Sequence, residues 1–520
     1  MSEKKQHHEI PFSEGEEDLD DIPPAKSVDD FLKMGNYCYL ILLTSEFLLL
    51  CAAGNMIYMM FAGSAPKVSC HGSNGTIQNV CDRYMNLSDL IDCKLELQYE
   101  FKSVNVEFDY LCDEGRWVKS SISVQMLGVL VGTLFLGTLS DRFGRKPTLV
   151  ASFVTTSLIG IASSFSTSLL SFTILRTILG FFNGGILGVY GVYKMEHIPK
   201  QHRFWVSTVI AWAPNFMILT AIAYVSYDWR TFQRLLVVVS SPALIMFFFV
   251  CESPRWLIQK GRIADARKVL QHIQHVDRQK ETKKEAMQEM LDITHQKLVE
   301  RNEKAKSYNI RHLFYGKEMS LATITFCSGQ FMTSMINYGL TFNIELLSGS
   351  FFINSATLGA VRWLINIAFA VLDFNSELAG RKLVHFISQS SIAVCLGAIT
   401  AVYLLDLRKD LSNLIRISTI LATATTSQTF ITKSITAMEY YPTMVRNSGL
   451  ALKSTCSRFG TIVAPQLFIL SSWGAFPYVV LTAMAVFDTL VYQIVIPETK
   501  GKALPENMPV KRKKIMEPLI

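Results

Sequence analysis

Five ionisable side chains stand inside long apolar runs of the sequence, and their chemistry is the first indication of function. They are Glu46, Arg176, Arg362, Lys433 and Arg458. A charge inside a bilayer is costly, so such a group usually faces a cavity or a partner of opposite charge. A guanidinium can hold a carboxylate through two parallel hydrogen bonds while it repels an ammonium ion. A site built around one of these arginines would therefore favour an organic anion or a zwitterion.

The apolar runs that carry these charges are long enough to cross a membrane. Half of the 520 residues are hydrophobic and the mean hydropathy is +0.27, whereas about 20 apolar residues suffice for one helical span. A polar, acidic segment precedes the first run, so that run is not a cleaved signal peptide. We predict twelve spans, at 37–61, 118–139, 148–167, 169–193, 204–225, 231–251, 320–341, 351–372, 383–405, 412–435, 448–471 and 474–496.

These spans predict an all-α membrane protein of twelve transmembrane helices. A long charged segment divides them six and six, as expected of two bundles that rock about a site between them. The predicted units are the cytoplasmic tail 1–36, the first six-helix bundle 37–251, the cytoplasmic loop 252–319, the second bundle 320–496 and the basic tail 497–520.

The positive charge of the chain follows the membrane topology. The formal net charge is +7, which by itself could suggest a nucleic-acid partner. The basic residues instead follow even-numbered spans, such as Arg142 and Lys146, or lie in the tail at Lys511–Lys514. This bias places both termini in the cytoplasm and argues against nucleic acid. The KRKK tail could bind anionic lipid headgroups.

The segment 62–117 after the first span is predicted to lie outside. It contains four cysteines, which suit a disulfide-stapled cap better than a metal site and allow three pairings. It also contains two glycosylation sequons, which favour a plasma-membrane protein. The cysteines are Cys70, Cys81, Cys93 and Cys112, and the sequons begin at Asn74 and Asn86.

A glycine-rich charged loop follows the second span, from Gly137 to Lys146. Gly137 and Gly144 permit a tight turn and a close helix approach, while Asp141 can pair with basic groups and latch one conformation. The ten residues resemble the signature loop of the major facilitator superfamily. Residues 379–382 of the second half repeat it only in degenerate form.

Further motifs narrow the resemblance. They are 107–112 (EFDYLC), 228–230 (DWR), 252–257 (ESPRWL), 439–449 (EYYPTMVRNSG) and 497–501 (PETKG). Together they resemble the organic cation, anion and zwitterion (carnitine) carriers, from the first span to residue 507.

This resemblance implies a major facilitator fold, a cavity between two halves, and facilitated diffusion or exchange. The sequence has no GxxxxGK[ST] motif for ATP and implies no cofactor; coupling to a sodium or proton gradient stays open. The residues that we expect to form conformational latches are Gly137, Asp141, Arg142, Gly144, Arg145, Arg176, Glu196, Arg203, Glu252, Arg255, Glu439 and Arg446.

The resemblance also selects substrate-binding candidates. Arg458 matches an arginine of the anion and carnitine carriers, where cation carriers have an acidic residue. Tyr338 matches a cavity tyrosine, whereas Asn337 stands where many relatives have a second aromatic residue. Asn366 replaces a basic residue of some anion carriers, which favours a zwitterion. Asn55 is a further candidate, although polar residues also bridge helices.

The other membrane charges have less certain partners. Arg362 stands where the family usually has an acidic residue, and it could pair with Glu46 or Glu345 or join Arg458 in a positive cavity. For Arg176 we expect a structural role. Lys433 lies about two turns from the cytoplasmic end of its span, so we expect it to snorkel toward the surface.

The leading hypothesis is a carrier of small organic anions or zwitterions, not an enzyme. One alternative is a cation carrier with Glu46 and Glu345 as counter-ions. Another is a membrane sensor or scaffold without transport. Catalytic motifs such as HExxH and GxSxG are absent from the sequence.

Overall fold

The computed structural model describes residues 32–72, 75–77, 94–199, 202, 206, 212–278, 287, 290–294, 296, 310–375, 380–442, 444–469 and 474–501. Each of the twelve predicted spans coincides with helix in this part of the chain. By length and apolar composition alone, six of these helices qualify as membrane spans. The others are shorter or carry more polar side chains, which are tolerated in a bilayer where they face neighbouring helices.

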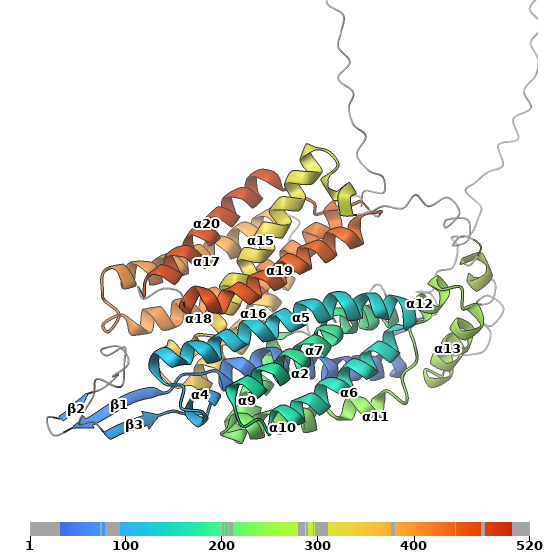
Figure 1. The fold of residues 1–520 in the computed structure, drawn as a ribbon. Coiled ribbons are helices and arrows are strands. Elements are labelled where there is room, and N and C mark those ends of the chain that lie inside the picture. The colour runs from blue at the N-terminus through green and yellow to red at the C-terminus, as the bar shows by residue number, and fades with distance from the viewer. Residues whose placement is uncertain are drawn as a thin grey trace, which may run out of the picture.

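The first half forms one group of helices in Figure 1, coloured blue to green. α7 packs along α5, α6 and α2, and α2 also contacts α9 and α10. Small residues allow the close approach of α5 and α7, since a Cβ at Gly132 would lie 1.8 Å from the Phe181 carbonyl oxygen. The helices are α2 (Asn36–Ala62), α5 (Gly115–Phe143), α6 (Arg145–Ser163), α7 (Leu169–His197), α9 (Trp212–Ser226), α10 (Trp229–Ser240) and α11 (Pro242–Met246).

The second half forms a separate group, coloured yellow to red in Figure 1. α15 packs along α19, and α18 packs against α16 and α17. The helices are α15 (Lys317–Thr341), α16 (Phe351–Asn375), α17 (Arg381–Leu404), α18 (Ser412–Tyr440), α19 (Arg446–Ile469) and α20 (Phe476–Val495), with short 3-10 turns η6 (Ile310–Phe314) and η7 (Ile344–Leu346).

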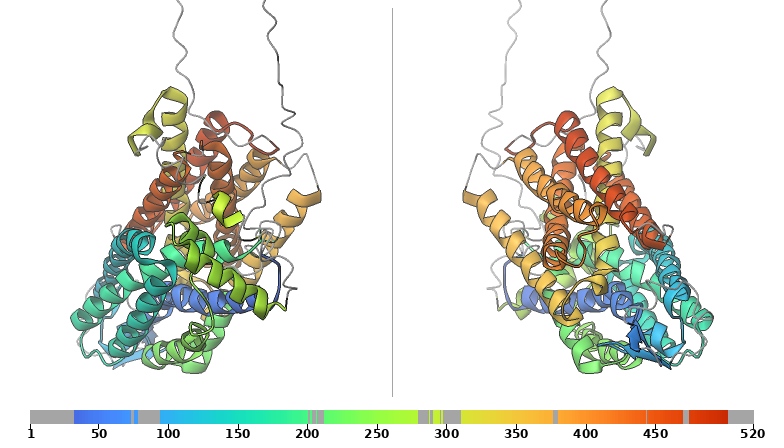
Figure 2. Two further views of the ribbon diagram at one scale, coloured as in Figure 1. Left: turned by 90° about the vertical axis from the view of Figure 1, so that its right-hand side faces the viewer. Right: turned by 90° about the vertical axis from the view of Figure 1, so that its left-hand side faces the viewer.

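Opposite ends of the molecule carry different additions. At one end, β1 (Lys67–Gly72) pairs antiparallel with β2 (Gly75–Ile77) and β3 (Lys94–Gln98), followed by α4 (Val104–Glu107) and η3 (Cys112–Glu114). At the other end lie α12 (Pro254–Gln259) and α13 (Ile263–Val276), which Figure 2 (left) shows in front of the first half. We call these ends the sheet end and the α13 end.

The two halves make direct contact toward the sheet end. α5 meets α19 there, and Ser123 Oγ donates to the Ile462 carbonyl oxygen at 2.8 Å. Lys119 forms an ion pair with Glu345 at 3.2 Å.

Aromatic rings add to this junction. Phe61 of the first half lies 5.0 Å from Phe351 and 6.2 Å from Phe352 between ring centroids. Toward the α13 end, by contrast, α5 and α19 diverge in Figure 1.

Candidate substrate site and conformational latches

A cluster of polar side chains in the first half, which includes Glu46 and Lys194, lies beside Arg458 of the second half. The Glu46 carboxylate accepts a hydrogen bond from Asn215 Nδ2 at 2.7 Å and lies within electrostatic range of Lys194. The Lys194 ammonium lies 5.8 Å from the centre of the Tyr190 ring. α2, α7 and α9 thus bring one acidic and one basic side chain together beside an aromatic ring.

Arg458 of α19 lies opposite this group. Its guanidinium is in electrostatic range of Tyr190, which links it across the interface to the first half. The side chain is half-buried. Among the residues that the structure describes, it makes neither an ion pair nor a hydrogen bond. Arg458 therefore retains its hydrogen-bond donors for a ligand.

Arg362 is the second arginine at this interface, and its surroundings answer a question that the sequence left open. Its Nη2 donates to Asn337 Oδ1 at 2.8 Å and to the Thr423 carbonyl oxygen at 3.1 Å. The guanidinium carbon lies 5.6 Å from the centre of the Phe216 ring of the first half. Within the described ranges it has no carboxylate partner, and its buried Nε makes no hydrogen bond.

Neither predicted carboxylate pairs with Arg362. Glu345 instead pairs with Lys119, and Glu46 is bonded to Asn215. Asn337 explains why a charge is tolerated here, because its amide oxygen accepts from Arg362 and from Thr426 Oγ1 at 2.9 Å. The two positions at which the resemblance indicates a departure from the family, Asn337 and Arg362, are therefore direct hydrogen-bond partners.

The other substrate-binding candidates occupy two different places. Tyr338 lies in electrostatic range of Arg362 and packs on Phe342 with ring centroids 5.6 Å apart. Asn366 is buried and accepts a hydrogen bond from Ser427 Oγ at 2.8 Å; it lines a small cavity of about 40 Å³ between α16 and α18. Tyr338 thus lies near Arg362, whereas Asn366 is directed into its own six-helix bundle.

Asn55 and Arg176 lie inside the first half and away from this interface. Arg176 is fully buried and donates to Gln125, Gln233 and the Asn55 carbonyl oxygen at 2.9–3.0 Å. Its guanidinium also lies 4.2 Å from the Tyr58 ring centre. This arrangement has the structural role expected of Arg176, and it makes Asn55 a bridge between helices.

The prediction for Lys433 is wrong. Its ammonium is completely buried and forms an ion pair with Asp488 of α20 at 2.5 Å, with further bonds to Gly329 and Thr333 of α15. A snorkelling lysine would be exposed, whereas a buried carboxylate holds this one in place. Our sequence analysis missed Asp488, although an acidic residue within the run 474–496 was a visible signal. It also missed Lys194 at the interface.

The predicted latch of the first half lies at the α13 end. Arg145 pairs with Asp141 and, at 3.5 Å, with Glu196, while Arg255 Nε donates to the Glu196 carbonyl oxygen. Glu252 accepts from the backbone N–H groups that begin α6, at 3.1 Å from Arg145 and 3.2 Å from Lys146.

The glycines of this signature loop behave differently from each other. Gly144 has φ +118°, and a Cβ there would lie 2.3 Å from Glu252 Oε2, so the tight turn is as predicted. At Gly137 a Cβ would meet no atom within 4 Å, so the expected close helix approach is not found there. Arg142 is exposed and lies over the Phe143 ring at 5.5 Å.

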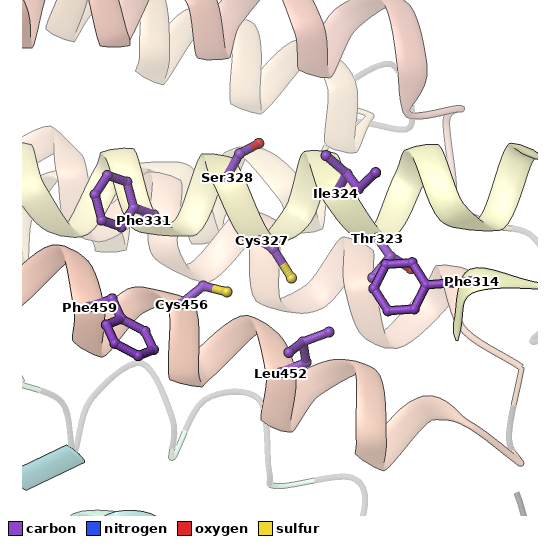
Figure 3. Close-up of a pocket in the computed structure, with 9 residues that line it drawn as sticks. All are labelled: Phe314, Thr323, Ile324, Cys327, Ser328, Phe331, Leu452, Cys456 and Phe459. Carbon is purple, nitrogen blue, oxygen red and sulfur yellow. The ribbon is translucent and has the colours of Figure 1, made fainter. Parts of the chain in front are cut away.

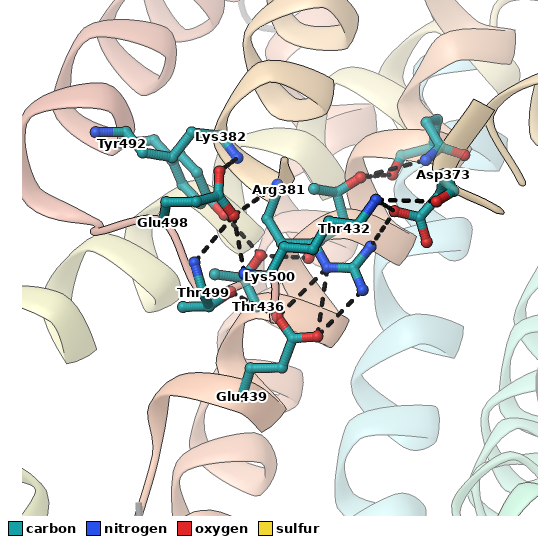
Figure 4. Close-up of polar contacts among 11 residues, drawn as sticks. Asp373, Arg381, Lys382, Thr432, Thr436, Glu439, Tyr492, Glu498, Thr499 and Lys500 are labelled. Carbon is teal, nitrogen blue, oxygen red and sulfur yellow. Dashed lines mark hydrogen bonds and ion pairs between the residues drawn. The ribbon is translucent and has the colours of Figure 1, made fainter. Parts of the chain in front are cut away.

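The second half carries an equivalent network around Arg381, shown in Figure 4. Arg381 pairs with Asp373 at 2.7 Å and with Glu439 at 3.2 Å. Glu498 accepts from the backbone N–H groups of Arg381 and Lys382 at 2.8 and 3.0 Å. The predicted latch residue Glu439 belongs to this network, whereas Arg446 bonds to the Tyr441 carbonyl oxygen.

Some predicted features fall outside the described residues. Cys112 is disulfide-bonded, but the pairing of the loop cysteines stays a prediction, because the side chains of the other three are not described. The remaining features outside the described part of the chain are Arg203, the sequons at Asn74 and Asn86, and the KRKK tail.

Comparison with known proteins agrees with this architecture. The family described as "Sugar (and other) transporter" matches residues 98–509. Relatives include an organic cation transporter protein of Drosophila melanogaster (27% identical; 78% of this chain, 73% of that protein) and human organic anion transporter 3 (28%; 78% and 73%). Human solute carrier family 22 member 13 is 25% identical over 84% of this chain and 76% of its own length.

Solved structures show the same fold. The proton:xylose symporter XylE, of the major facilitator superfamily, superposes with a TM-score of 0.63 at 16% identity over 90% of this chain and 98% of its own. These matches bear out the expected fold of two six-helix bundles and a multi-pass membrane location. The chain belongs to the sugar (and other) transporter family of the major facilitator superfamily, among relatives of the organic cation and anion transporters.

Proposed function

We propose that this transporter carries small organic anions or zwitterions, such as carboxylates or carnitine-like compounds, by alternating access between its two halves. The observation that carries this proposal is Arg458, a guanidinium at the interface of the halves that has no ion-pair or hydrogen-bond partner within the described structure. A half-buried guanidinium can hold a carboxylate through two parallel hydrogen bonds.

The charges around Arg458 support the same substrate class. Arg362, Arg458 and Lys194 contribute three positive charges and Glu46 one negative charge, so these four side chains carry a formal charge of 3 − 1 = +2. An anion entering this region reduces an unfavourable concentration of positive charge, whereas a simple cation increases it.

A zwitterion has additional support from Glu46. This carboxylate comes from the opposite half and is bonded only on one oxygen in the described structure, since its Oε2 is buried without a hydrogen bond. A solute with a carboxylate toward Arg458 and an ammonium toward Glu46 would contact both halves. Tyr190 and Phe216 add aromatic surface for the apolar part of such a solute.

The contacts at the sheet end favour a conformation closed at that end. Together with the cytoplasmic position proposed for the basic loops, this corresponds to an inward-facing state. We also propose a plasma-membrane location, from the sequons, and leave the driving gradient to the uptake experiment. One of the relatives named above is an organic cation transporter and another an organic anion transporter, so sequence identity alone does not decide the charge of the substrate.

Uptake by proteoliposomes tests this function. Labelled monocarboxylates, carnitine, dicarboxylates and quaternary amines are offered with and without a sodium or proton gradient. Arg458→Asp is expected to lower carboxylate uptake at least tenfold. Arg408→Gln serves as the matched control, because Arg408 is exposed and pairs with Asp406 away from the interface.

The outcomes separate the competing functions. Carboxylate uptake that survives Arg458→Asp, together with saturable uptake of quaternary amines, would favour the cation carrier, in which Glu46 is the counter-ion. Saturable binding without flux for the whole panel would favour a sensor or scaffold.

A further inference from the structure

An apolar cavity between α15 and α19 contains two thiols. Its volume is about 530 Å³, and Phe314, Ile324, Phe331, Leu452 and Phe459 provide most of its wall. Figure 3 shows Cys327 of α15 and Cys456 of α19 directed into the space between the helices, toward each other. Both cysteines are free, and each lies within interacting range of the other.

The two helices are held close on the C-terminal side of this thiol pair, within two turns of it. Ser334 of α15 and Thr461 of α19 are hydrogen-bonded at 2.9 Å between their hydroxyl oxygens. A Cβ at Gly460 would lie 2.4 Å from the Phe331 carbonyl oxygen, so the backbones nearly touch there. A disulfide requires such proximity, because its two Cα atoms are usually less than about 7 Å apart.

A buried ammonium lies beside the thiols. Lys453 is one helical turn before Cys456, only 3% exposed, and in electrostatic range of Cys327. Its Nζ donates to Ser434 Oγ at 2.7 Å, which fixes its position. A neighbouring positive charge favours the thiolate, the nucleophilic form of cysteine. Most buried cysteines lack such a neighbour and are inert.

The cavity is accessible from an apolar phase. Ile324 of α15 is 55% exposed and Phe459 of α19 is 50% exposed, although both line the cavity. On membrane-spanning helices, exposed apolar side chains meet acyl chains. An apolar peroxide dissolved in the bilayer can therefore approach the thiols more readily than a polar one from water.

We propose that Cys327 and Cys456 form a dithiol site that an apolar hydroperoxide, such as an oxidised acyl chain, converts to a disulfide. One thiolate attacks the terminal oxygen of the hydroperoxide, and the O–O bond breaks. The departing alkoxide takes up the proton that the thiol released and becomes an alcohol, while the cysteine becomes a sulfenic acid. The second thiol attacks this sulfur, forms the S–S bond and releases water. In sum, two thiols and one hydroperoxide give one disulfide, one alcohol and one water.

The test uses the reduced, full-length protein in lipid nanodiscs. It is treated with cumene hydroperoxide or hydrogen peroxide, its remaining thiols are alkylated, and peptides are identified by mass spectrometry. We expect a peptide pair linked through Cys327 and Cys456, formed at a cumene hydroperoxide concentration at least threefold below that needed of hydrogen peroxide. Full alkylation of both cysteines after treatment would overturn the site, and equal sensitivity to both oxidants would overturn the membrane route.

Variants make the result specific. Cys327→Ser and Cys456→Ser should each abolish the linked pair, whereas Cys395→Ser, at another buried free cysteine of the same half, should keep it. Lys453→Gln should slow linkage at least threefold and Lys453→Arg should restore it; an unchanged rate in Lys453→Gln would refute the role of the ammonium. Monodisperse elution of each variant verifies folding. The readout does not involve transport, so it is independent of the proposed function.

Discussion

Glu252 and Glu498 occupy equivalent positions in the two halves, yet their pKa values move in opposite directions. Each carboxylate accepts from the first two backbone N–H groups of a helix, α6 or α17. Burial raises the pKa of Glu252, and the nearby Glu196 carboxylate raises it further, against the effect of three backbone hydrogen bonds. For Glu498, burial is outweighed by four backbone hydrogen bonds, so its pKa is lowered.

The arginines of the two networks differ in the same sense. Arg381 is bound by two carboxylates that are each about one-fifth exposed, Asp373 and Glu439. Arg145 is bound by Asp141, which is two-thirds exposed, and more distantly by Glu196. The half with the weaker sequence motif therefore has the better satisfied network. Motif strength in the sequence does not measure how firmly a latch is bonded.

The largest expected difference between the halves concerns the arginines. Arg381→Ala leaves two partly buried carboxylates without their common partner and should lower the free energy of unfolding by roughly 3 kcal/mol, the lower limit for a buried pair. Arg145→Ala should cost less than half as much, since Asp141 is already solvated. Thermal unfolding of both variants in detergent measures this. An equal or greater loss in Arg145→Ala would contradict the comparison.

For the glycines before α6 and α17, we expect the larger loss of stability in the first half. Gly144 has φ +118° and ψ 157°, a region open essentially to glycine alone, whereas Gly380 has φ −69°. In both, a Cβ would lie 2.3 Å from a flexible glutamate side chain. Gly144→Ala should therefore destabilise by roughly 2 kcal/mol more than Gly380→Ala, because of backbone strain. The difference in melting temperature between the two alanine variants gives the answer; equal melting temperatures would argue against strain.

The smallest effect concerns the two glutamates and depends on pH. A lowered pKa means that Glu498 stabilises the fold above about pH 4.5 and loses this contribution as the pH falls through its folded value. A raised pKa gives Glu252 the opposite behaviour: its contribution is present below about pH 4.5 and is lost as the pH rises. At pH 7, Glu498→Gln should therefore cost about 1 kcal/mol and Glu252→Gln less.

Melting curves from pH 7 down to about pH 3 check this prediction, because the contribution of Glu498 is lost only below about pH 4.5. The gap between wild type and Glu498→Gln should narrow on acidification. A gap that widens, or one that is larger for Glu252→Gln at neutral pH, would show that the two carboxylates are not distinguished as described.

The positions of the helices could be predicted from the sequence more completely than the side-chain contacts between them. Each of the twelve predicted runs coincides with helix in the described part of the chain, because a bilayer restricts spanning segments to helices of about that length. Helical periodicity does not reveal which residue lies opposite on another helix. For this reason the pair Lys433–Asp488 was missed, and the partner of Arg362 was found to be Asn337 rather than a carboxylate.

The substrate candidates illustrate the same limit. Arg458 lies at the interface of the two halves and Tyr338 lies near Arg362, but Asn55 and Asn366 are turned into their own bundles. A polar residue in a span faces either a passage or a neighbouring helix, and only the rotation of the helix decides between these environments. The same types of amino acid occur in both environments, so residue type alone does not distinguish them.

The contacts between the two halves at the sheet end stabilise the conformation that is closed at that end. Phe61 with Phe351, Lys119 with Glu345 and Ser123 with Ile462 must all separate before that end opens. The free energy of this separation fixes the ratio of the two orientations, and about 1.4 kcal/mol changes the ratio tenfold. One aromatic pair contributes about 1 kcal/mol. A single substitution far from the substrate site can therefore change the ratio of the two conformations in the absence of substrate.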